Sequence, residues 1–285
     1  MRDLIQRFRR RRAGPGRTLA EARAAFAPAG HLHPVPDDVP VTPVSAGGVP
    51  SYWLDPPGAT DRVLLFVHGG GFSRGSLRSH GELAARLGRT AGMRVLFCEY
   101  RLAPEHPFPA AADDVRTVWH WLREGRPAGE IALCGDSAGA GLIVGLLATL
   151  AGAGRPVPYA AVLLSPHVDL TTSGASVTDR VDDDPVLTPA QLRGIAADYL
   201  AGTDPADPAA SPLYADLRGL PPLLILVGTA ELLFSDAQRL ADAARAAGVD
   251  VTVRVGDWLP HAYPLLLGTP EAADATEQIA AFLRR

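Results

Sequence analysis

The pentapeptide Gly135-Asp136-Ser137-Ala138-Gly139 places a serine between two glycines. A short apolar run from Ile131 leads into it, and an apolar stretch without proline follows it as far as Leu150. This pattern predicts a buried strand that turns sharply into a helix, with Ser137 at the corner. So tight a turn has no room for larger side chains at the glycines, and it forces the serine into a sparsely populated backbone conformation. Ser137 would then lie beside free N–H groups at the helix start, which makes it a candidate nucleophile.

The motif also occurs by chance in loops of small residues, so a nucleophilic role requires partners. A serine hydroxyl attacks efficiently only when an imidazole takes its proton, and a carboxylate must orient that imidazole. In a strand-turn-helix arrangement the three groups follow along the chain as Ser, acid, His. Glu231 and His261 each come just after a predicted strand, in that order. We therefore expect Ser137, Glu231 and His261 to meet at the carboxyl edge of one sheet.

Three aspartates compete with Glu231 for the role of the acid. Asp236 falls one turn into the helix that follows, and Asp169 follows the preceding strand. Asp257 is too close in sequence to His261 to approach its ring easily. Glu231 is favoured, with Asp236 as the main alternative.

A triple glycine follows a fully apolar predicted strand over residues 62–67, in His68-Gly69-Gly70-Gly71-Phe72. Ordering three glycines costs more conformational entropy than ordering other residues, so such a run indicates a structural or functional requirement. Backbone N–H groups without flanking side chains can approach a ligand oxygen closely, so those of Gly70 and Gly71, with that of Ala138, form the predicted oxyanion hole. A flexible loop is the alternative.

The elements that must position these groups alternate between strand and helix. Such alternation predicts an α/β protein with a mostly parallel, doubly wound sheet that binds ligands at the carboxyl ends of its strands. An antiparallel edge hairpin with its turn at Gly47-Gly48 is predicted before the first parallel strand. The predicted parallel strands cover residues 62–67, 94–99, 131–136, 160–165, 222–227 and 249–255, and the helices 82–89, 110–124, 137–150, 189–201, 232–247 and 270–283.

The insertion over about residues 167–219 breaks this rhythm and is expected to lie above the strand ends as part of a lid. The substrate pocket is predicted to lie among the lid segments, Phe72 and the loop from Trp258 to Tyr263. Asp182-Asp183-Asp184 inside the insertion is interpreted as a solvated helix start, because nothing spaces these carboxylates around one metal ion.

The N-terminal residues 1–34 are predicted to form two helical pieces, the second opening with a capping box of Thr18 and Glu21. His31 and His33 have no further metal ligand nearby and are interpreted as loop histidines. Glu105 and His106 lie in a proline-rich segment, where they are expected to anchor an ordered loop rather than to act as an acid–base pair.

Length and composition limit the function classes. A chain of 285 residues, 47% hydrophobic, can bury the core of one α/β domain or of one domain with a small subdomain. A net charge of −4 gives no basis for nucleic-acid binding. No run of 18 apolar residues predicts a membrane span, and no secretory signal is recognised. Cys98 and Cys134 lie in predicted strands as buried thiols, which favours a cytoplasmic protein.

Five motifs together resemble the hormone-sensitive-lipase-like (bacterial family IV) esterases of the α/β-hydrolase fold, over about residues 45–285. They are His68-Gly-Gly-Gly71, the segment from Tyr100 to Ala111, Gly135-Asp-Ser-Ala-Gly139, Ser211-Pro-Leu213 and Pro260-His-Ala262. The resemblance implies an N-terminal helical cap segment over 1–45 and a hydrolase domain over 46–285 that carries the cap insertion. It also implies hydrolysis of small to medium acyl esters or lactones through an acyl-enzyme, without metal or cofactor.

The sequence departs from the family pattern at two positions. Glu231 stands where aspartate is frequent, and Ala140 stands where a further glycine often follows the serine motif. By analogy with the fold, the strands of Cys98 and Cys134 flank the strand before His68, about 9.5 Å apart, which excludes a disulfide.

Two other functions remain open on the same scaffold. A biosynthetic acyltransferase or cyclisation catalyst would pass the acyl group to something other than water, and a receptor would bind a small molecule without turnover. The presence of His261 argues against the receptor. The sequence does not decide between a monomer and a homodimer.

Overall fold

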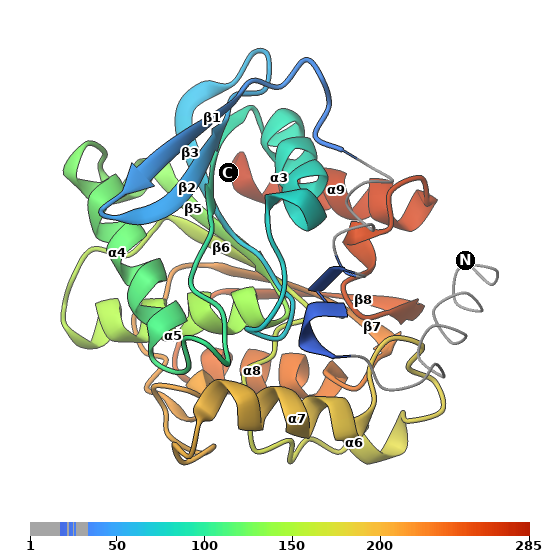
Figure 1. Ribbon diagram of the computed structural model, residues 1–285. Coiled ribbons are helices and arrows are strands. Elements are labelled where there is room, and N and C mark those ends of the chain that lie inside the picture. Colours follow the sequence, from blue (N-terminus) through green and yellow to red (C-terminus); the bar gives the residue numbers. More distant parts are fainter. Residues whose placement is uncertain (1–17, 22, 25, 27–33) are drawn as a thin grey trace.

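The computed structural model describes residues 18–21, 23, 24, 26 and 34–285. Its centre is an eight-stranded sheet with the strand order β1-β2-β4-β3-β5-β6-β7-β8 (Figure 1). The six strands from β4 to β8 in this order are parallel to one another. β1 and β2 form the predicted antiparallel edge hairpin, and β2 also pairs antiparallel with β4. The strands are β1 (Val41–Ala46), β2 (Val49–Leu54), β3 (Thr60–Val67), β4 (Met93–Cys98), β5 (Ile131–Asp136), β6 (Ala160–Leu164), β7 (Leu223–Ala230) and β8 (Val251–Pro260). The predicted mostly parallel, doubly wound sheet is confirmed.

The central strands are apolar throughout because both faces of the sheet are covered. In β3, Val63, Leu65 and Val67 point into one apolar cluster, and Leu64 and Phe66 point into the other. All five side chains are fully buried. This explains why the strand appears in the sequence as a continuous hydrophobic run rather than as an alternating pattern.

Helices cover both faces. On one face lie α3 (Leu77–Ala91) and α9 (Pro270–Leu283), which contact each other, and on the other lie α4 (Ala110–Glu124), α5 (Ala138–Gly152) and α8 (Phe234–Ala246) (Figure 1). The chain also forms three short 3₁₀ turns, η1 (Ala128–Glu130), η2 (Pro212–Tyr214) and η3 (Tyr263–Leu265).

The chain reverses its direction of winding beside β3. From β3 it moves to β4 on one side, and it then returns to β5 on the other side. A crevice at the carboxyl end of a parallel sheet forms at such a switch point. The triple glycine follows β3 and Ser137 follows β5, so the topology brings both predicted parts of the site to the same place.

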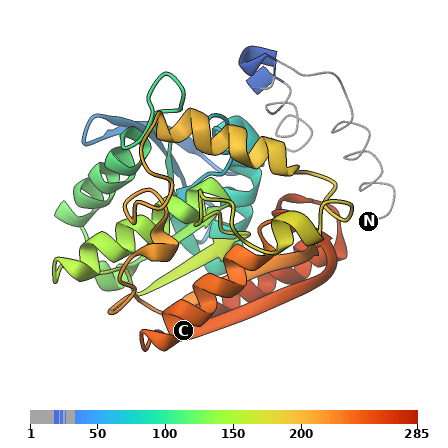
Figure 2. The same cartoon turned by 90° about the horizontal axis from the view of Figure 1, so that it is seen from below.

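The insertion over residues 167–219 carries α6 (Ser176–Asp179) and α7 (Pro189–Leu200). Ile195 and Tyr199 of α7 pack into the same apolar cluster as α4 and α5. Figure 2 shows α7, in gold, beside α5. The insertion therefore packs against the sheet side on which the nucleophile helix lies.

Three predicted elements differ from the structure. The helix expected over 82–89 begins at Leu77, because Ser76 and Ser79 form a hydrogen-bonded cap, with the Ser76 N–H donating to the Ser79 hydroxyl over 3.0 Å. The last strand, expected to end at residue 255, continues to Pro260. Asp182-Asp183-Asp184 follows α6 instead of starting a helix.

The expectation that the whole acidic run is solvated is wrong for Asp184. Its side chain is completely buried and accepts the backbone N–H groups of Val186, Leu187 and Leu232 at 2.7–2.8 Å. Its third donor belongs to the residue after Glu231. Asp184 thus ties the insertion to the loop that carries the predicted acid.

The remaining expectations concern the cysteines and the N-terminus. Cys98 and Cys134 are buried free thiols on β4 and β5, the two neighbours of β3, as predicted. The Thr18–Glu21 capping box is confirmed, since each residue's side chain accepts the other's backbone N–H. His31 and His33 lie outside the described residues.

Candidate active site

Ser137 lies at the turn between β5 and α5 with φ 51° and ψ −118°, a conformation that L-residues rarely adopt. Its N–H donates to the Leu164 carbonyl over 2.8 Å, and its carbonyl accepts the His167 N–H over 3.1 Å. A Cβ at Gly135 would lie 2.6 Å from the Val67 carbonyl oxygen, and one at Gly139 would overlap that same atom. The predicted crowding at both glycines is confirmed, and it explains why the strained turn needs them.

His261 and Glu231 form a short hydrogen bond. The His261 Nδ1 lies 2.6 Å from the Glu231 Oε2, and Glu231 is fully buried. With its Nδ1–H donated to the carboxylate, the ring leaves Nε2 as the nitrogen that can accept a proton. This is the tautomer that a general base for Ser137 requires.

Ser165 binds both Glu231 and the residue after His261, and sequence reasoning missed it. Its hydroxyl donates to the other oxygen of Glu231, Oε1, over 2.8 Å and accepts the Ala262 N–H over 2.9 Å. The preceding residue, Leu164, supplies the carbonyl that binds the Ser137 N–H. A signal was present, because Ser165 directly follows the strand next to the acid-bearing strand.

The pKa of His261 is raised above its ordinary value of 6.5. Burial alone would lower this pKa, but the hydrogen bond and negative charge of Glu231 outweigh it, with additional contributions from Asp184 and Asp136. A carboxylate beside an imidazole favours its protonated form. The arrangement therefore stabilises the imidazolium that forms when His261 takes a proton.

The rival acids are engaged elsewhere. Asp236 accepts the N–H groups of Val168 and Asp169 at 3.1 Å. Asp169 pairs with Arg239 over 2.6 Å. The Asp257 side chain accepts a long hydrogen bond of 3.4 Å from the Thr229 hydroxyl.

The loop that carries the predicted oxyanion glycines has an unusual backbone conformation. Gly70, Gly71 and Phe72 all have positive φ, at 116°, 61° and 56°. A Cβ at Gly70 would overlap the Arg74 carbonyl, and one at Gly71 would lie 2.8 Å from the Ile195 side chain on α7. Within the described part of the chain, the N–H groups of Gly70, Gly71 and Ala138 have no hydrogen-bond acceptor.

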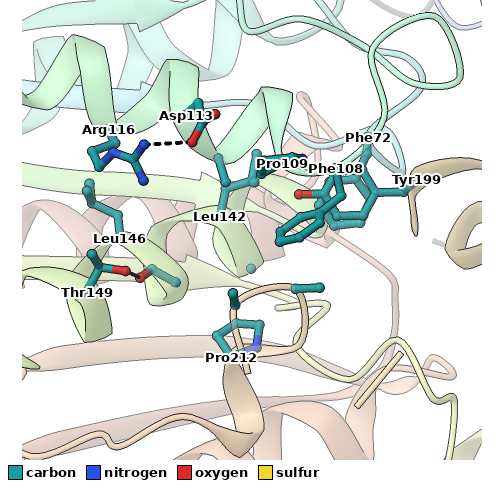
Figure 3. Close-up of a pocket in the computed structure, with 15 residues that line it drawn as sticks. Phe72, Phe108, Pro109, Asp113, Arg116, Leu142, Leu146, Thr149, Tyr199 and Pro212 are labelled. Atoms are coloured by element: carbon teal, nitrogen blue, oxygen red, sulfur yellow. Dashed lines mark hydrogen bonds and ion pairs between the residues drawn. The ribbon is translucent and has the colours of Figure 1, made fainter. Parts of the chain in front are cut away.

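A cavity lies beside the site, between α4, α5, α7 and the loop before η2 (Figure 3). Phe72 stacks on Tyr199 at 3.8 Å between ring centroids, and Phe108 packs edge-on against Tyr199. In Figure 3 these three rings gather at one end, and the ion pair of Asp113 and Arg116 lies at the other. The wall between them is formed by α5 residues including Gly141, Leu142, Gly145, Leu146 and Thr149.

Of the three predicted substrate contacts, only Phe72 lines this cavity. Trp258 is 63% exposed on β8. Tyr263 is buried in the apolar cluster between the sheet and α9, on the opposite face. Trp258 lies on the strand β8, which was predicted to end before it, and Tyr263 begins the turn η3.

The part of the chain that the structure describes contains neither a metal-binding cluster nor a membrane-spanning helix. No group of three or more histidine, cysteine, aspartate and glutamate side chains in ranges 18–26 (without 22 and 25) and 34–285 is arranged to hold a metal ion. No helix in this same part of the chain is long and apolar enough to cross a membrane.

Known proteins match the chain over most of its length. A family model for the alpha/beta hydrolase fold matches residues 64–265. An acetyl-hydrolase of Streptomyces hygroscopicus is 45% identical, and the match covers 92% of this chain and 86% of the relative. An esterase of Acinetobacter venetianus is 33% identical, and the match covers 88% of this chain and 84% of the relative.

Solved structures agree. A crystal structure of an esterase from the bacterial hormone-sensitive lipase family superimposes with a TM-score of 0.96 at 42% identity, covering 99% of this chain and 96% of that one. A hormone-sensitive lipase from a metagenome library superimposes with a TM-score of 0.95 at 35% identity, covering 99% and 97%. The chain therefore belongs to the α/β-hydrolase family and, within it, to the hormone-sensitive-lipase-like esterases.

Proposed function

We propose that this protein hydrolyses carboxylic esters of short acyl groups through an acyl-enzyme on Ser137. The observation that carries the proposal is the 2.6 Å contact between His261 and Glu231 at the edge where the strained Ser137 turn lies. Leu164 and Ser165 join the two parts, because one binds the Ser137 N–H and the other binds both Glu231 and Ala262.

In the first half of the reaction, Ser137 Oγ forms a bond to the ester carbonyl carbon while the Nε2 of His261 takes the hydroxyl proton. The carbonyl oxygen becomes an oxyanion that accepts the N–H groups of Gly70, Gly71 and Ala138. Collapse of this intermediate breaks the bond to the alcohol oxygen, and the imidazolium returns the proton to the leaving alcohol.

In the second half, a water molecule attacks the acyl carbon and gives its proton to His261. The same N–H groups stabilise the second oxyanion, and the bond to Ser137 breaks as His261 protonates its Oγ. Each oxyanion donor contributes about 3 kcal/mol in the transition state, which is why three preset donors matter. Glu231 holds the tautomer and stabilises the charged ring throughout.

The cavity along α5 is proposed to receive the apolar part of the ester. It begins at Phe72, next to the oxyanion glycines, and at Gly141, one helical turn beyond Ser137. The aromatic stack of Phe72 and Tyr199 supplies an apolar surface at this end. The similarity to a protein named acetyl-hydrolase supports short acyl groups as substrates.

The proposal is tested with Ser137→Ala on p-nitrophenyl acetate, with Ser45→Ala on the exposed face of β1 as a matched control. The S137A variant should lose at least about a thousandfold in kcat, since loss of the nucleophile removes the covalent route. S45A should retain wild-type activity. A fall of less than about a hundredfold in S137A would contradict a serine mechanism.

A further inference from the structure

His80 on α3 lies next to the nucleophile turn, although neither the catalytic groups nor the cavity include it. Its Nε2 is 3.4 Å from the Asp136 Oδ2, and both side chains are buried to 97% or more. Asp136 directly precedes Ser137, and its other oxygen, Oδ1, accepts the Gly69 N–H over 2.9 Å. A chain of contacts thus runs from α3 through Asp136 to the first glycine of the oxyanion loop.

The second ring nitrogen fixes the orientation of His80. Its Nδ1 lies 2.7 Å from the Ser79 hydroxyl, and that hydroxyl also contacts the Ser76 carbonyl over 2.9 Å and accepts the Ser76 N–H. The cap of α3 therefore holds one edge of the ring while the other edge faces Asp136. A ring held on both sides is an effective support for a buried carboxylate.

The loop itself depends on the position of Asp136. A Cβ on Gly69 would overlap the Asp136 carboxylate, so the two groups are in close contact. Gly69 is the residue before Gly70, whose N–H is proposed to bind the oxyanion. A rotation of the Asp136 side chain would release the Gly69 N–H and allow the loop to shift.

His80 also offsets the negative charge of the Asp136 carboxylate. An ionised carboxylate buried one residue from the nucleophile repels a developing oxyanion. Burial raises the pKa of Asp136, but the charge and hydrogen bond of His80 and the N–H of Gly69 bring that pKa below its ordinary value, so this carboxylate is ionised. A donor on the far side of the carboxylate draws its charge away from the oxyanion.

The nearby titratable groups leave His80 as the main partner. The His68 ring is 5.6 Å from that of His80, and burial, followed by the effect of His80, lowers the pKa of His68 to about 3. Glu99 binds the Leu77 N–H over 2.7 Å, and its other oxygen lies 4.0 Å from His68. Neither group makes a hydrogen bond to Asp136 in the described part of the chain.

We propose that His80 is a positioning residue of the proposed ester hydrolysis: it holds Asp136 in the rotamer that binds Gly69 and offsets the carboxylate charge behind the oxyanion hole. The inference rests on the proposed function. It predicts that His80 acts through Asp136 on transition-state stabilisation and not on substrate binding.

The experiment compares His80→Leu, His80→Gln and His80→Asn with His120→Leu, a matched control at an exposed position of α4. His80→Leu should lower kcat for p-nitrophenyl acetate by about 10- to 100-fold with KM within about threefold, because misplaced donors cost mainly the transition state. The affinity for an alkyl trifluoromethyl ketone, which forms an oxyanion on Ser137, should fall in parallel. His120→Leu should match the wild type.

Two further comparisons separate positioning from folding. The Gln amide can occupy the place of Nε2, facing Asp136, whereas the shorter Asn amide mimics Nδ1, so H80Q should exceed H80N in kcat by at least about fivefold. In an Asp136→Asn background, His80→Leu should lower kcat little further, because the partner of His80 is already altered.

The proposal is overturned if His80→Leu keeps kcat within twofold, if its loss lies in KM alone, or if its effect adds fully to that of Asp136→Asn. If His80→Leu does not fold, equal kcat values for the Gln and Asn variants overturn it. Failure of the proposed function is distinct, because then Ser137→Ala would retain hydrolysis and the ketone would not bind Ser137 in the wild type.

Discussion

The hydroxyl of Ser165 lies 2.8 Å from the Oε1 of Glu231 and accepts the N–H of the residue after His261. Ser165 has a positive φ of 47°, and its side chain is completely buried. One hydroxyl thus orients both partners of the proposed acid–base pair. The Glu231 Oε1 also accepts the Gly228 N–H over 2.7 Å, so the carboxylate is held by backbone and side chain together.

Replacing Ser165 with alanine should therefore lower kcat without abolishing it. Glu231 retains the Gly228 N–H, but the Ala262 N–H loses its acceptor, which costs about 1–3 kcal/mol of stability. We expect kcat to fall about tenfold with KM unchanged, measured on p-nitrophenyl acetate beside a thermal unfolding curve. Wild-type kcat in a variant that still folds would show that the hydroxyl does not orient the pair.

The pH dependence should report the raised pKa of His261. His261 accepts a proton only when neutral, so kcat/KM should rise with pH through a pKa above 6.5 and be lost at lower pH. In Glu231→Gln the negative charge is gone and burial still lowers the pKa, so the acid limb should move to lower pH. The rate at the plateau should fall by about 10⁴-fold because the tautomer is no longer held. An unmoved limb in the variant would exclude Glu231 as the main partner of His261.

Asp236→Asn tests whether Asp236, rather than Glu231, is the acid of the triad, and it should also change how stability depends on pH. Burial raises the pKa of Asp236 to about 7, from an ordinary value of 3.8. The folded state therefore binds a proton that the unfolded state has lost between these two values, and the stability linked to this group is present below pH 3.8 and is lost as pH rises through about 7. The loss amounts to as much as about 4 kcal/mol.

In Asp236→Asn, urea unfolding between pH 5 and pH 8 should show a weaker decline of stability with pH than in the wild type. Since Asp236 binds Val168 and Asp169 rather than His261, the variant should keep kcat within about threefold, provided that it folds. A loss of a thousandfold or more would instead favour Asp236 as the acid.

Gly145→Leu should narrow the cavity along α5. A Cβ at Gly145 meets no atom within 4 Å, and the residue lines the cavity in mid-helix. The change should stabilise the helix by up to about 1 kcal/mol while its side chain fills space. We expect kcat/KM for p-nitrophenyl hexanoate to fall at least tenfold more than that for the acetate.

The matched control is Gly194→Leu on the exposed side of α7, where an added Cβ also meets nothing. This variant changes helix propensity without placing a side chain in the cavity. It should leave the ratio of kcat/KM for the hexanoate to kcat/KM for the acetate unchanged. An unchanged ratio in Gly145→Leu would mean that the ester chain lies elsewhere.

Much of the site could be predicted because its signals are local. The glycines around Ser137 and after His68 reflect steric limits of the backbone at those positions, and such limits are visible in residue types. Glu231 and His261 could be placed because parallel strands end at one edge of a sheet. The order of strands along the chain then sufficed to bring distant residues together.

The remaining features arise from tertiary contacts that no local pattern encodes. Ser165 and His80 are ordinary residues whose importance comes from what lies beside them in space. Asp184 was interpreted as part of a solvated acidic run because the donor that ties it to the Glu231 loop, the Leu232 N–H, lies 48 residues further along the chain. Trp258 and Tyr263 were assigned to a pocket loop because the continuation of β8 to Pro260 has no regular alternation.

Covalent labelling tests the central claim most directly. The protein is incubated with a p-nitrophenyl alkylphosphonate, and the amount of p-nitrophenol released per chain is measured by absorbance. The labelled peptide is then sequenced by mass spectrometry. We predict one equivalent of p-nitrophenol per chain, complete loss of ester hydrolysis, the phosphonyl group on Ser137, and labelling at least a thousandfold slower in His261→Ala. Complete inhibition with the label on another residue, or full labelling of Ser137 while hydrolysis continues, would contradict the account.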